Sequence, residues 1–485
     1  MKSFSFVFFL LLASSLVVSQ NTIQSAIDQF SSSSELQSAS ISFLVTETSS
    51  GKVIASKNAL MTLPTASTAK LFATAGAIEL LGKDYRPSTR IYIDGPIVNG
   101  VLDGNIVIRG GGDVSLGSKF FNEEGKENAF LKQWVDTIKK LGITSVTGKI
   151  IADGSEFGYN GVPDGWAWTD MGNYYGAGPS GICIYDNTLK YYFKTGSNAG
   201  QLSELLYTVP KISDLVFRNY VTAENVSGDN SYIFGAPFSN DRFATGSLPL
   251  NSTKFEVKGS LPDPEYLLAL EFSSALLSSG VSIKLLATGV RNLPKDQKPK
   301  YDVNSKLIYT HYGATVGEIA KLTNMKSINL FAEGLVCLVG YKTTKMGTTD
   351  EGLRIIETHF KSKATLNSLF LNDGSGLSRS NGISATHFCN LLNYMASSSN
   401  YTTYFNTLPT AGKSGTIASL CRGEAGDGRV FAKSGTMNRI KSYAGYVYSK
   451  SGKKMTFSFT VNNFSGSSSS ITAQMEKVLN TIALY

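Results

Sequence analysis

Three short motifs in a fixed order constrain this chain more than any other feature. They are Ser67–Lys70 (Ser-Thr-Ala-Lys), Ser327–Asn329 (Ser-Ile-Asn) and Lys433–Thr436 (Lys-Ser-Gly-Thr). A serine hydroxyl is a poor nucleophile until a base accepts its proton, and on a helix a lysine three residues later shares the serine's face. A second serine can relay the proton, an asparagine can hold a substrate amide, and a Lys-Ser-Gly strand offers a cation and a hydroxyl to a carboxylate. A fold that brings the three motifs together would form a serine acyl-transfer site.

None of these motifs is specific by itself, because matches of three or four residues recur by chance in a chain of 485 residues. The pattern Ser-x-x-Lys occurs again at Ser451, and Lys-Ser-Gly occurs again at Lys413 and Lys450. The pattern Ser-x-Asn occurs again at Ser56 and Ser398. The sequence around each match must therefore distinguish them.

The sequence around Ser67 predicts a buried helix that this serine opens. Apolar residues recur at helical spacing after the motif, and Gly82 follows as a C-cap; these residues are Leu71, Ala75, Ile78 and Leu81. The free N–H groups and the positive dipole end of such a helix favour developing negative charge. This context supports Ser67 as the nucleophile.

The matches at Ser451 and Lys450 lie in a polar stretch between two strand-like runs, residues 443–448 and 455–461. This arrangement predicts a β-hairpin with both matches at its tip. A hairpin tip faces solvent, so neither match is expected to form part of a buried site.

The remaining choice lies between Lys413 and Lys433. Lys433 follows the short run 429–432 and precedes the predicted hairpin, which indicates the edge of an antiparallel sheet. Lys413 precedes a Gly-rich polar stretch, residues 422–428, which indicates a loop. We therefore place the third motif at Lys433.

On these motifs the chain resembles the class C low-molecular-mass penicillin-binding proteins, D-alanyl-D-alanine carboxypeptidases of the S13 peptidase family that also act as endopeptidases. The distance from Ser67 to Ser327 (327 − 67 = 260 positions) leaves room for the large insertion of this group. Further similar segments are residues 108–113, 173–177, 372–379 and 408–412. Ser434 departs from the family pattern, where threonine is commoner, but it keeps the hydroxyl.

The resemblance implies an α/β (α+β) fold: a β-lactamase/DD-peptidase-like catalytic domain with an antiparallel sheet flanked by helices, interrupted by a large β-rich insertion of two domains. Short strand patterns at 90–94, 105–109 and 149–153 and a helical pattern at 129–141 agree with this reading. The predicted divisions are a signal peptide (1–19), a catalytic domain (20–88 and 306–485), insertion domain II (89–155 and 255–305) and nested domain III (156–254).

The mechanism expected of such a site is acylation followed by deacylation. Ser67 attacks the carbonyl of the penultimate D-alanine, and Lys70 accepts its proton. Lys70 must be neutral to do so, and a nearby second cation, Lys433, lowers its pKa. Ser327 relays the proton to the leaving amine, and Asn329 positions the substrate amide and hydrogen-bonds Lys70.

Substrate binding is expected on the third motif. By resemblance, the backbone N–H groups of Ser67 and Thr436 form the oxyanion hole, and such donors contribute on the order of 3 kcal/mol each. The substrate's terminal carboxylate is expected to lie against the residues of this motif, which are Lys433, Ser434, Gly435 and Thr436.

The expected partners are peptidoglycan stem peptides as substrates and β-lactam antibiotics as covalent inhibitors. Three alternatives remain open at this stage. A β-lactamase shares the motifs but hydrolyses its acyl-enzyme quickly, and a catalytically silent peptidoglycan-binding module needs no intact set of motifs. The third alternative is an unrelated secreted β-protein with chance matches.

Composition narrows the possible ligands. The net charge of +8 and a pI near 9.0 favour an acidic polymer, and peptidoglycan qualifies. Nucleic acid is not expected, because no dense basic run or base-stacking motif is present. The three histidines show no zinc-binding spacing, so we expect no metal and no cofactor. The four scattered cysteines do not form a disulfide scaffold, although one bridge is compatible with their number.

The N-terminus has the pattern of a cleavable secretory signal. Lys2 precedes an apolar run from Phe4 to Val18 that ends in small residues near Ser19. The run is short for a membrane span, and no cysteine near its end suggests a lipoprotein. We expect export across the inner membrane to the periplasm, with a mature chain that starts near Gln20 or Asn21 and has no transmembrane segment.

Overall fold

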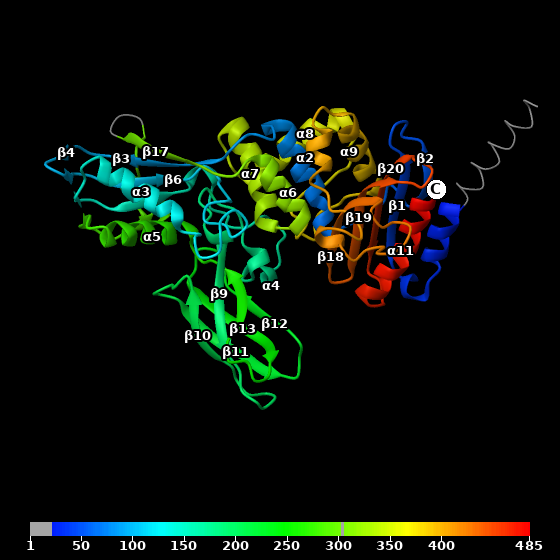
Figure 1. The fold of residues 1–485 in the computed structure, drawn as a ribbon, viewed down its shortest axis with the longest axis horizontal. Helices are drawn as coiled ribbons and strands as arrows, with labels where there is room; N and C mark the ends of the chain where they lie inside the picture. Colours follow the sequence, from blue (N-terminus) through cyan, green and yellow to red (C-terminus); the bar gives the residue numbers. More distant parts are fainter. Residues whose placement is uncertain (1–21, 302–304) are drawn as a thin grey trace, which may run out of the picture. The chain divides into compact units, whose positions relative to one another are not determined.

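The structure of the protein is a computed structural model that describes residues 22–301 and 305–485, which divide into two units (Figure 1). The first unit comprises the chain up to Lys83 together with Ala320–Ile328 and Leu353–Tyr485, and the second comprises Asp84–Ile319 and Asn329–Gly352. The predicted signal peptide, residues 1–19, and the predicted mature start lie outside the described residues. Within the described ranges no helix combines the length and the apolar character that crossing a bilayer requires.

A five-stranded antiparallel sheet forms the centre of the first unit, in the order β18-β19-β20-β1-β2. Strand β1 pairs along its whole length with β20, so segments from the two ends of the chain lie side by side. Strands β19 and β20 form the predicted hairpin, which is confirmed. The bounds are β1 Ser40–Glu47, β2 Val53–Lys57, β18 Val430–Met437, β19 Ile440–Tyr448 and β20 Lys454–Asn462.

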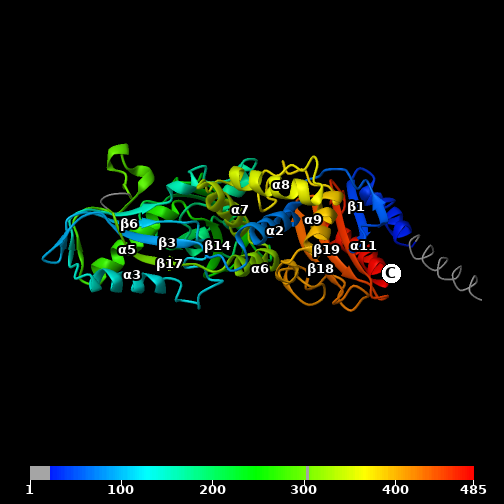
Figure 2. The same ribbon diagram turned by 90° about the horizontal axis from the view of Figure 1, so that it is seen from above.

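Helices cover both faces of this sheet (Figure 2). On one face Phe43 packs in a core with Met475 of α11 (Ser468–Leu484) and with the helix of residues 22–31. On the other face Leu44 packs with Cys389 of α9 (Ala385–Ser397). The alternation of Phe43 and Leu44 follows from the two-residue period of a strand. The predicted antiparallel sheet flanked by helices is confirmed.

Helix α2 (Lys70–Leu81) lies beneath the predicted nucleophile and is buried from Lys70 to Ile78. It ends at Gly82, whose φ of 82° lets its N–H bond the carbonyl of Ile78. The predicted helix and its C-cap are therefore confirmed. The unit also contains α10 (Tyr401–Phe405), and two helices run across the division between the units, α6 (Val316–Lys326) and α8 (Thr349–Ala364).

The second unit contains a five-stranded mixed sheet in the order β16-β8-β6-β3-β17 and a four-stranded sheet in the order β15-β7-β5-β4. Trp134 of α3 (Ala129–Lys140) and Phe272 of α5 (Pro264–Ser278) meet edge to face in its core. The strands are β3 Ser88–Ile93, β4 Ile97–Val98, β5 Val101–Leu102, β6 Ile106–Arg109, β7 Ser145–Val146, β8 Ile150–Asp153, β15 Ser282–Ile283, β16 Thr288–Gly289 and β17 Lys306–Tyr312, and the unit also holds α7 (Asn329–Thr344).

The strands in the middle of the second unit's sequence form two three-stranded sheets, in the orders β10-β9-β14 and β11-β13-β12. The segment that holds them begins and ends at one place, because the N–H of Leu261 donates to the carbonyl of Asn187 at 2.8 Å. The bounds are β9 Thr188–Lys194, β10 Glu204–Val209, β11 Val216–Glu224, β12 Asn230–Phe234, β13 Asp241–Pro249 and β14 Phe255–Ser260, with the short α4 at Trp168–Met171.

The pairing of strands bears on two of the predicted domain boundaries, which stay predictions. The predicted end of domain III at residue 254 separates β14 from β9, although the two strands pair from Phe255↔Phe193 onward. The predicted return to the catalytic domain at residue 306 falls at the start of β17, which pairs with β3 in the second unit. Both pairings join segments more than 60 residues apart (255 − 193 = 62 and 306 − 93 = 213), and hydrophobic patterns within one segment do not record such pairing.

Candidate active site

Ser67 and Lys70 meet within one tight turn. Ser67 lies in a 3-10 helix, η2 (Ala66–Ala69), directly before α2, and not in the first turn of the α-helix as expected. Side chains three residues apart are eclipsed in a 3-10 helix. Lys70 Nζ consequently lies 2.9 Å from Ser67 Oγ. Ala66, directly before the serine, has a φ of 48°, a left-handed conformation that is rare for alanine and is typical of functional sites.

Lys70 is fully buried and has a second hydrogen-bond acceptor. Its Nζ donates to the carbonyl of Ser375 at 2.7 Å. Ser375 lies in the segment 372–379 that resembles the family, but the sequence alone gave this carbonyl no role. A backbone acceptor leaves no signal in side-chain identity, which is why sequence reasoning missed it.

Lys433 lies in β18 with its side chain fully buried. Its Nζ donates to Ser327 Oγ at 2.9 Å and to the carbonyl of Ser434 at 2.7 Å. Burial lowers the pKa of Lys433 well below its ordinary value, and the charge of Lys70 lowers this pKa further. The structure thus brings Ser67, Lys70, Ser327 and Lys433 together within the first unit.

Ser327 lies in the short connection between α6 and α7, with a φ of 60°. This left-handed backbone is unusual for serine and ends α6 immediately before the hydroxyl. Asn324 anchors the end of α6, because its Nδ2 donates to Thr74 Oγ1 of α2 at 3.2 Å and to Thr407 Oγ1 at 2.8 Å. The position of Ser327 is therefore tied to the helix that begins with Lys70.

Asn329 is the first residue of α7 and belongs to the second unit. Its Nδ2 donates to the carbonyl of Tyr175 at 2.8 Å, within the segment 173–177 that resembles the family. The expected contact with Lys70 and the expected role in holding a substrate amide remain predictions.

Gly435 allows β18 to approach the nucleophile. A Cβ at this position would lie 2.4 Å from the carbonyl oxygen of Thr65 and 3.0 Å from the backbone nitrogen of Ser67. Ser434 Oγ pairs with Thr416 Oγ1 at 2.8 Å, and Thr436 is exposed. Thr416 is a further hydroxyl beside the third motif that sequence reasoning did not identify, because it comes from the adjoining loop.

The other matches to the three motif patterns lie away from the buried lysines. Lys413 has a side chain that is 61% exposed and pairs with Asp427 at 2.9 Å, in the loop that the sequence predicted. Lys450 and Ser451 are exposed in the turn between β19 and β20. Ser398, the start of another match, donates to Glu79. Within the described residues, none of these matches joins the buried cluster around Lys70.

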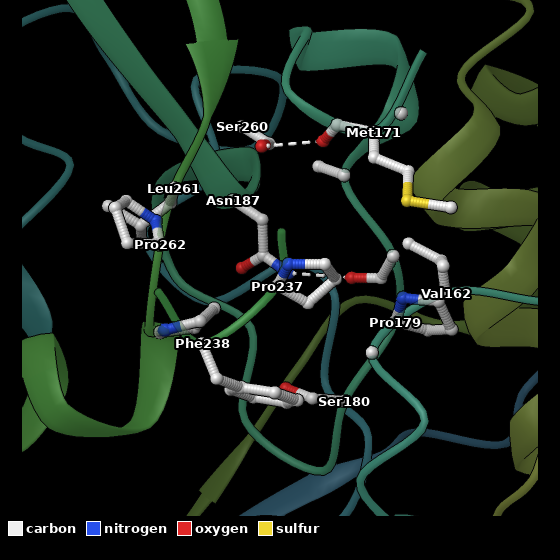
Figure 3. A pocket seen from close by; sticks show the side chains of 15 residues that line it. Val162, Met171, Pro179, Ser180, Asn187, Pro237, Phe238, Ser260, Leu261 and Pro262 are labelled. Carbon is white, nitrogen blue, oxygen red and sulfur yellow. Dashed lines mark hydrogen bonds between the residues drawn. The ribbon is translucent and has the colours of Figure 1, made fainter. Parts of the chain in front are cut away.

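The described part of the chain contains no group of three or more His, Cys, Asp or Glu side chains arranged to hold a metal ion. A cavity of about 30 Å³ in the second unit, lined largely by glycine, proline and apolar residues, is also without motif residues (Figure 3). Its polar groups bond one another: Ser260 Oγ donates to the carbonyl of Met171 at 2.7 Å, and Asn187 Nδ2 to that of Gly178 at 3.1 Å.

Residues 23–482 match the D-Ala-D-Ala carboxypeptidase 3 (S13) family, which is nearly the whole chain. The chain belongs to this family. The resemblance inferred from the motifs is confirmed, and this S13 peptidase is an enzyme of the D-Ala-D-Ala carboxypeptidase class.

Relatives of this S13 peptidase come from bacteria and from an amoeba. It is 29% identical to a D-alanyl-D-alanine carboxypeptidase of Actinomadura sp. (strain R39), over 89% of this chain and 79% of the relative. It is 24% identical to the D-alanyl-D-alanine carboxypeptidase DacB of Haemophilus influenzae, over 88% of this chain and 86% of that relative. It is 25% identical to a penicillin-sensitive carboxypeptidase A of Dictyostelium discoideum, over 81% of this chain and 76% of that relative.

Solved structures agree on the fold of this S13 peptidase. Penicillin-binding protein 4 (dacB) from Haemophilus influenzae superimposes with a TM-score of 0.76 at 21% identity, covering 92% of this chain and 97% of the other. A complex of the same protein with a novel β-lactam gives a TM-score of 0.71 at 20% identity, covering 92% and 95%. The α+β fold expected from the sequence is thereby confirmed.

Proposed function

We propose that this S13 peptidase is a serine D-Ala-D-Ala carboxypeptidase and endopeptidase that acts on peptidoglycan stem peptides through an acyl-enzyme on Ser67, and that β-lactams acylate the same serine. The observation that carries the proposal is the 2.9 Å contact between Ser67 Oγ and Lys70 Nζ, beside a second buried lysine that bonds Ser327. A nucleophile, a base, a relay and a cation are the groups that acyl transfer requires.

Acylation begins with Lys70 in its neutral form. Two buried ammonium groups that face one another raise each other's electrostatic free energy, so the pair favours a state with one neutral amine. In that state Ser67 donates its proton to Lys70 Nζ, and Ser67 Oγ attacks the carbonyl carbon of the penultimate D-alanine. Ser327, which accepts a hydrogen bond from Lys433, then relays this proton: it takes one from Lys70 as it gives its own to the leaving amine, which restores neutral Lys70. Water then hydrolyses the ester.

The third motif supplies the binding groups. The exposed hydroxyl of Thr436, the Ser434–Thr416 hydroxyl pair and the Lys433 ammonium offer donors to the terminal carboxylate of a stem peptide. Because Gly435 brings β18 against the backbone nitrogen of Ser67, the N–H groups of Ser67 and Thr436 are suited to form the oxyanion hole. Release of a terminal D-alanine and cleavage of a cross-link use the same acyl-enzyme and differ only in the leaving amine.

The test is intact-mass spectrometry of the protein after incubation with benzylpenicillin. Ring opening breaks the β-lactam C–N bond, forms the Ser67 ester and leaves every penicillin atom attached. We expect one adduct per wild-type chain, none in Ser67→Ala, and full adduct in Ser451→Ala, the matched control from the second Ser-x-x-Lys sequence. An adduct in Ser67→Ala would contradict the assignment. Rapid loss of the wild-type adduct with turnover of penicillin would instead indicate a β-lactamase.

Incubation with cross-linked muropeptides separates the two peptidase activities. Release of D-alanine alone indicates a carboxypeptidase, and monomeric products from dimers indicate an endopeptidase. Because peptidoglycan lies outside the cytoplasmic membrane, we also propose that the chain is exported, and N-terminal sequencing of the mature protein tests the predicted start near Gln20 or Asn21.

A further inference from the structure

A tight turn at residues 373–381 contacts Lys70 and the backbone directly before Ser67. The carbonyl of Ser375 accepts from Lys70 Nζ at 2.7 Å. Gly376, with a φ of 82°, lies so close to the nucleophile's turn that a Cβ would be 1.9 Å from the carbonyl oxygen of Ala66. The shape of this turn therefore determines where the acceptor for Lys70 lies relative to Ser67.

Asp373 holds the turn together from within. Its carboxylate is fully buried and accepts hydrogen bonds from four groups of the turn. Oδ1 accepts from the backbone N–H of Gly376 at 2.8 Å and from Asn381 Nδ2 at 2.7 Å. Oδ2 accepts from the backbone N–H of Ser378 at 2.7 Å and from Ser375 Oγ at 3.1 Å. All four donors come from the turn, so the carboxylate fixes the peptide units on either side of the Ser375 carbonyl.

The direction of that carbonyl matters for the chemistry of Lys70. A neutral amine has two N–H bonds and one lone pair. When one N–H points to the Ser375 carbonyl, rotation about the Cε–Nζ bond is restricted and the lone pair can face the Ser67 hydroxyl 2.9 Å away. The acceptor thus removes part of the rotational freedom of an amine at the end of four rotatable bonds.

We propose that Asp373 is a positioning residue for the acylation step, acting through the Ser375 carbonyl to orient the amine of Lys70 toward Ser67. This inference rests on the proposed function, since it assigns Lys70 as the base. Displacement of a catalytic group by about 1 Å can lower a rate about 100-fold. The proposed function assigns this turn no direct contact with substrate, so substrate binding should not depend on it.

The experiment measures the acylation of wild type and variants by benzylpenicillin in rapid mixing. It yields three quantities: the fraction of chains that form the adduct, the limiting first-order rate, and the half-saturating concentration.

Asp373→Asn preserves the shape of the side chain but places an NH₂ group against N–H or O–H donors. Asp373→Ala removes all four hydrogen bonds. Glu79→Gln is the matched control, because Glu79 is a largely buried carboxylate in the same unit that accepts from Tyr394, Ser398 and Asn400.

We expect the limiting rate to fall about 10- to 100-fold in Asp373→Asn and further in Asp373→Ala, with the adduct fraction unchanged in Asp373→Asn and the half-saturating concentration within about threefold of wild type. Glu79→Gln should keep the wild-type rate within about threefold. If Asp373→Ala does not fold, the limiting rate of the isosteric Asp373→Asn variant tests the proposal by itself.

Three results would overturn the inference: a wild-type limiting rate in Asp373→Asn, a loss of activity explained wholly by a smaller adduct fraction, or an equal fall in Glu79→Gln. A purely structural role for Asp373 predicts the second result. Absence of any adduct in the wild-type protein would instead contradict the proposed function, so the two failures are distinguishable.

Discussion

Lys433 Nζ lies 2.9 Å from Ser327 Oγ, which joins the second and third motifs across 106 positions of the chain (433 − 327 = 106). Both lysines of the site, Lys70 and Lys433, are fully buried, and each bonds a different serine. This arrangement pairs a hydroxyl with an amine twice within one unit. In the proposed mechanism, these two pairs handle the proton at the nucleophile and at the leaving group.

The Lys433–Ser327 contact predicts a large effect for Lys433→Ala on acylation by benzylpenicillin. Losing a buried charge-assisted contact costs about 2–4 kcal/mol, which lowers the second-order rate constant about 30- to 1000-fold. Lys413→Ala and Lys450→Ala are matched controls at the other Lys-Ser-Gly sequences, and both are exposed. Each should change the rate less than about threefold. A slow Lys413→Ala variant with wild-type circular dichroism would show that the third motif has been misplaced.

The lowered pKa of Lys433 predicts a pH-dependent stability. The unfolded chain holds this proton with the ordinary lysine pKa of 10.5, whereas the folded state holds it less tightly, so the folded state is penalised below that pH. Lys433→Met removes the charge at similar volume. Its free energy of unfolding in urea should exceed that of wild type near neutral pH, and the difference should shrink as pH rises toward 10.5.

The slope of that difference cannot exceed about 1.4 kcal/mol per pH unit, because one proton is involved. Lys413→Met serves as the control, since its ammonium faces solvent. A constant difference between wild type and Lys433→Met across this pH range would mean that Lys433 remains protonated at little cost.

The four cysteines should be unreactive thiols in the native protein. All four are free and buried. Burial raises the pKa of Cys183 to about 11 and that of Cys421 to about 12, so the nucleophilic thiolate is scarce near neutral pH. Ellman's reagent should detect less than about one equivalent in the native state and all four in denaturant without reductant. Two equivalents in denaturant would reveal a disulfide.

The strands β9 to β14 should be removable as a block. Residues 188–260 begin and end beside the hydrogen bond between Leu261 and Asn187, so a short Gly-Ser linker can replace them. Every residue of the buried lysine site lies outside this block. Acylation should stay within about threefold of wild type, while activity on large muropeptides changes.

A deletion of residues 156–254 is the matched comparison. It removes β9 and leaves its partner β14 unpaired, which exposes a bare strand edge. We expect this variant to aggregate or unfold in part, as measured by size-exclusion chromatography. If the 188–260 deletion loses acylation while remaining folded, the segment contributes to the chemistry and this prediction is wrong.

Local patterns in the sequence determined much of the fold around the site. The helix after Ser67, its glycine cap and the hairpin of β19 and β20 follow from periodicity and turn residues within about 20 positions. The exposure of Lys450 and Ser451 follows from the same hairpin. Hydrogen bonds between near neighbours produce these elements, so the adjoining sequence contains the information that specifies them.

Only the tertiary structure decided which groups surround the lysines. The Ser375 carbonyl reaches Lys70 across 305 positions, and the hydroxyl of Ser327 reaches Lys433 through a left-handed backbone that no pattern signals. The pairing of β17 with β3 and of β14 with β9 likewise joins strands that no local pattern connects. Such contacts form because burial and strand pairing favour them once the whole chain has folded, and they depend on residues that are remote in sequence.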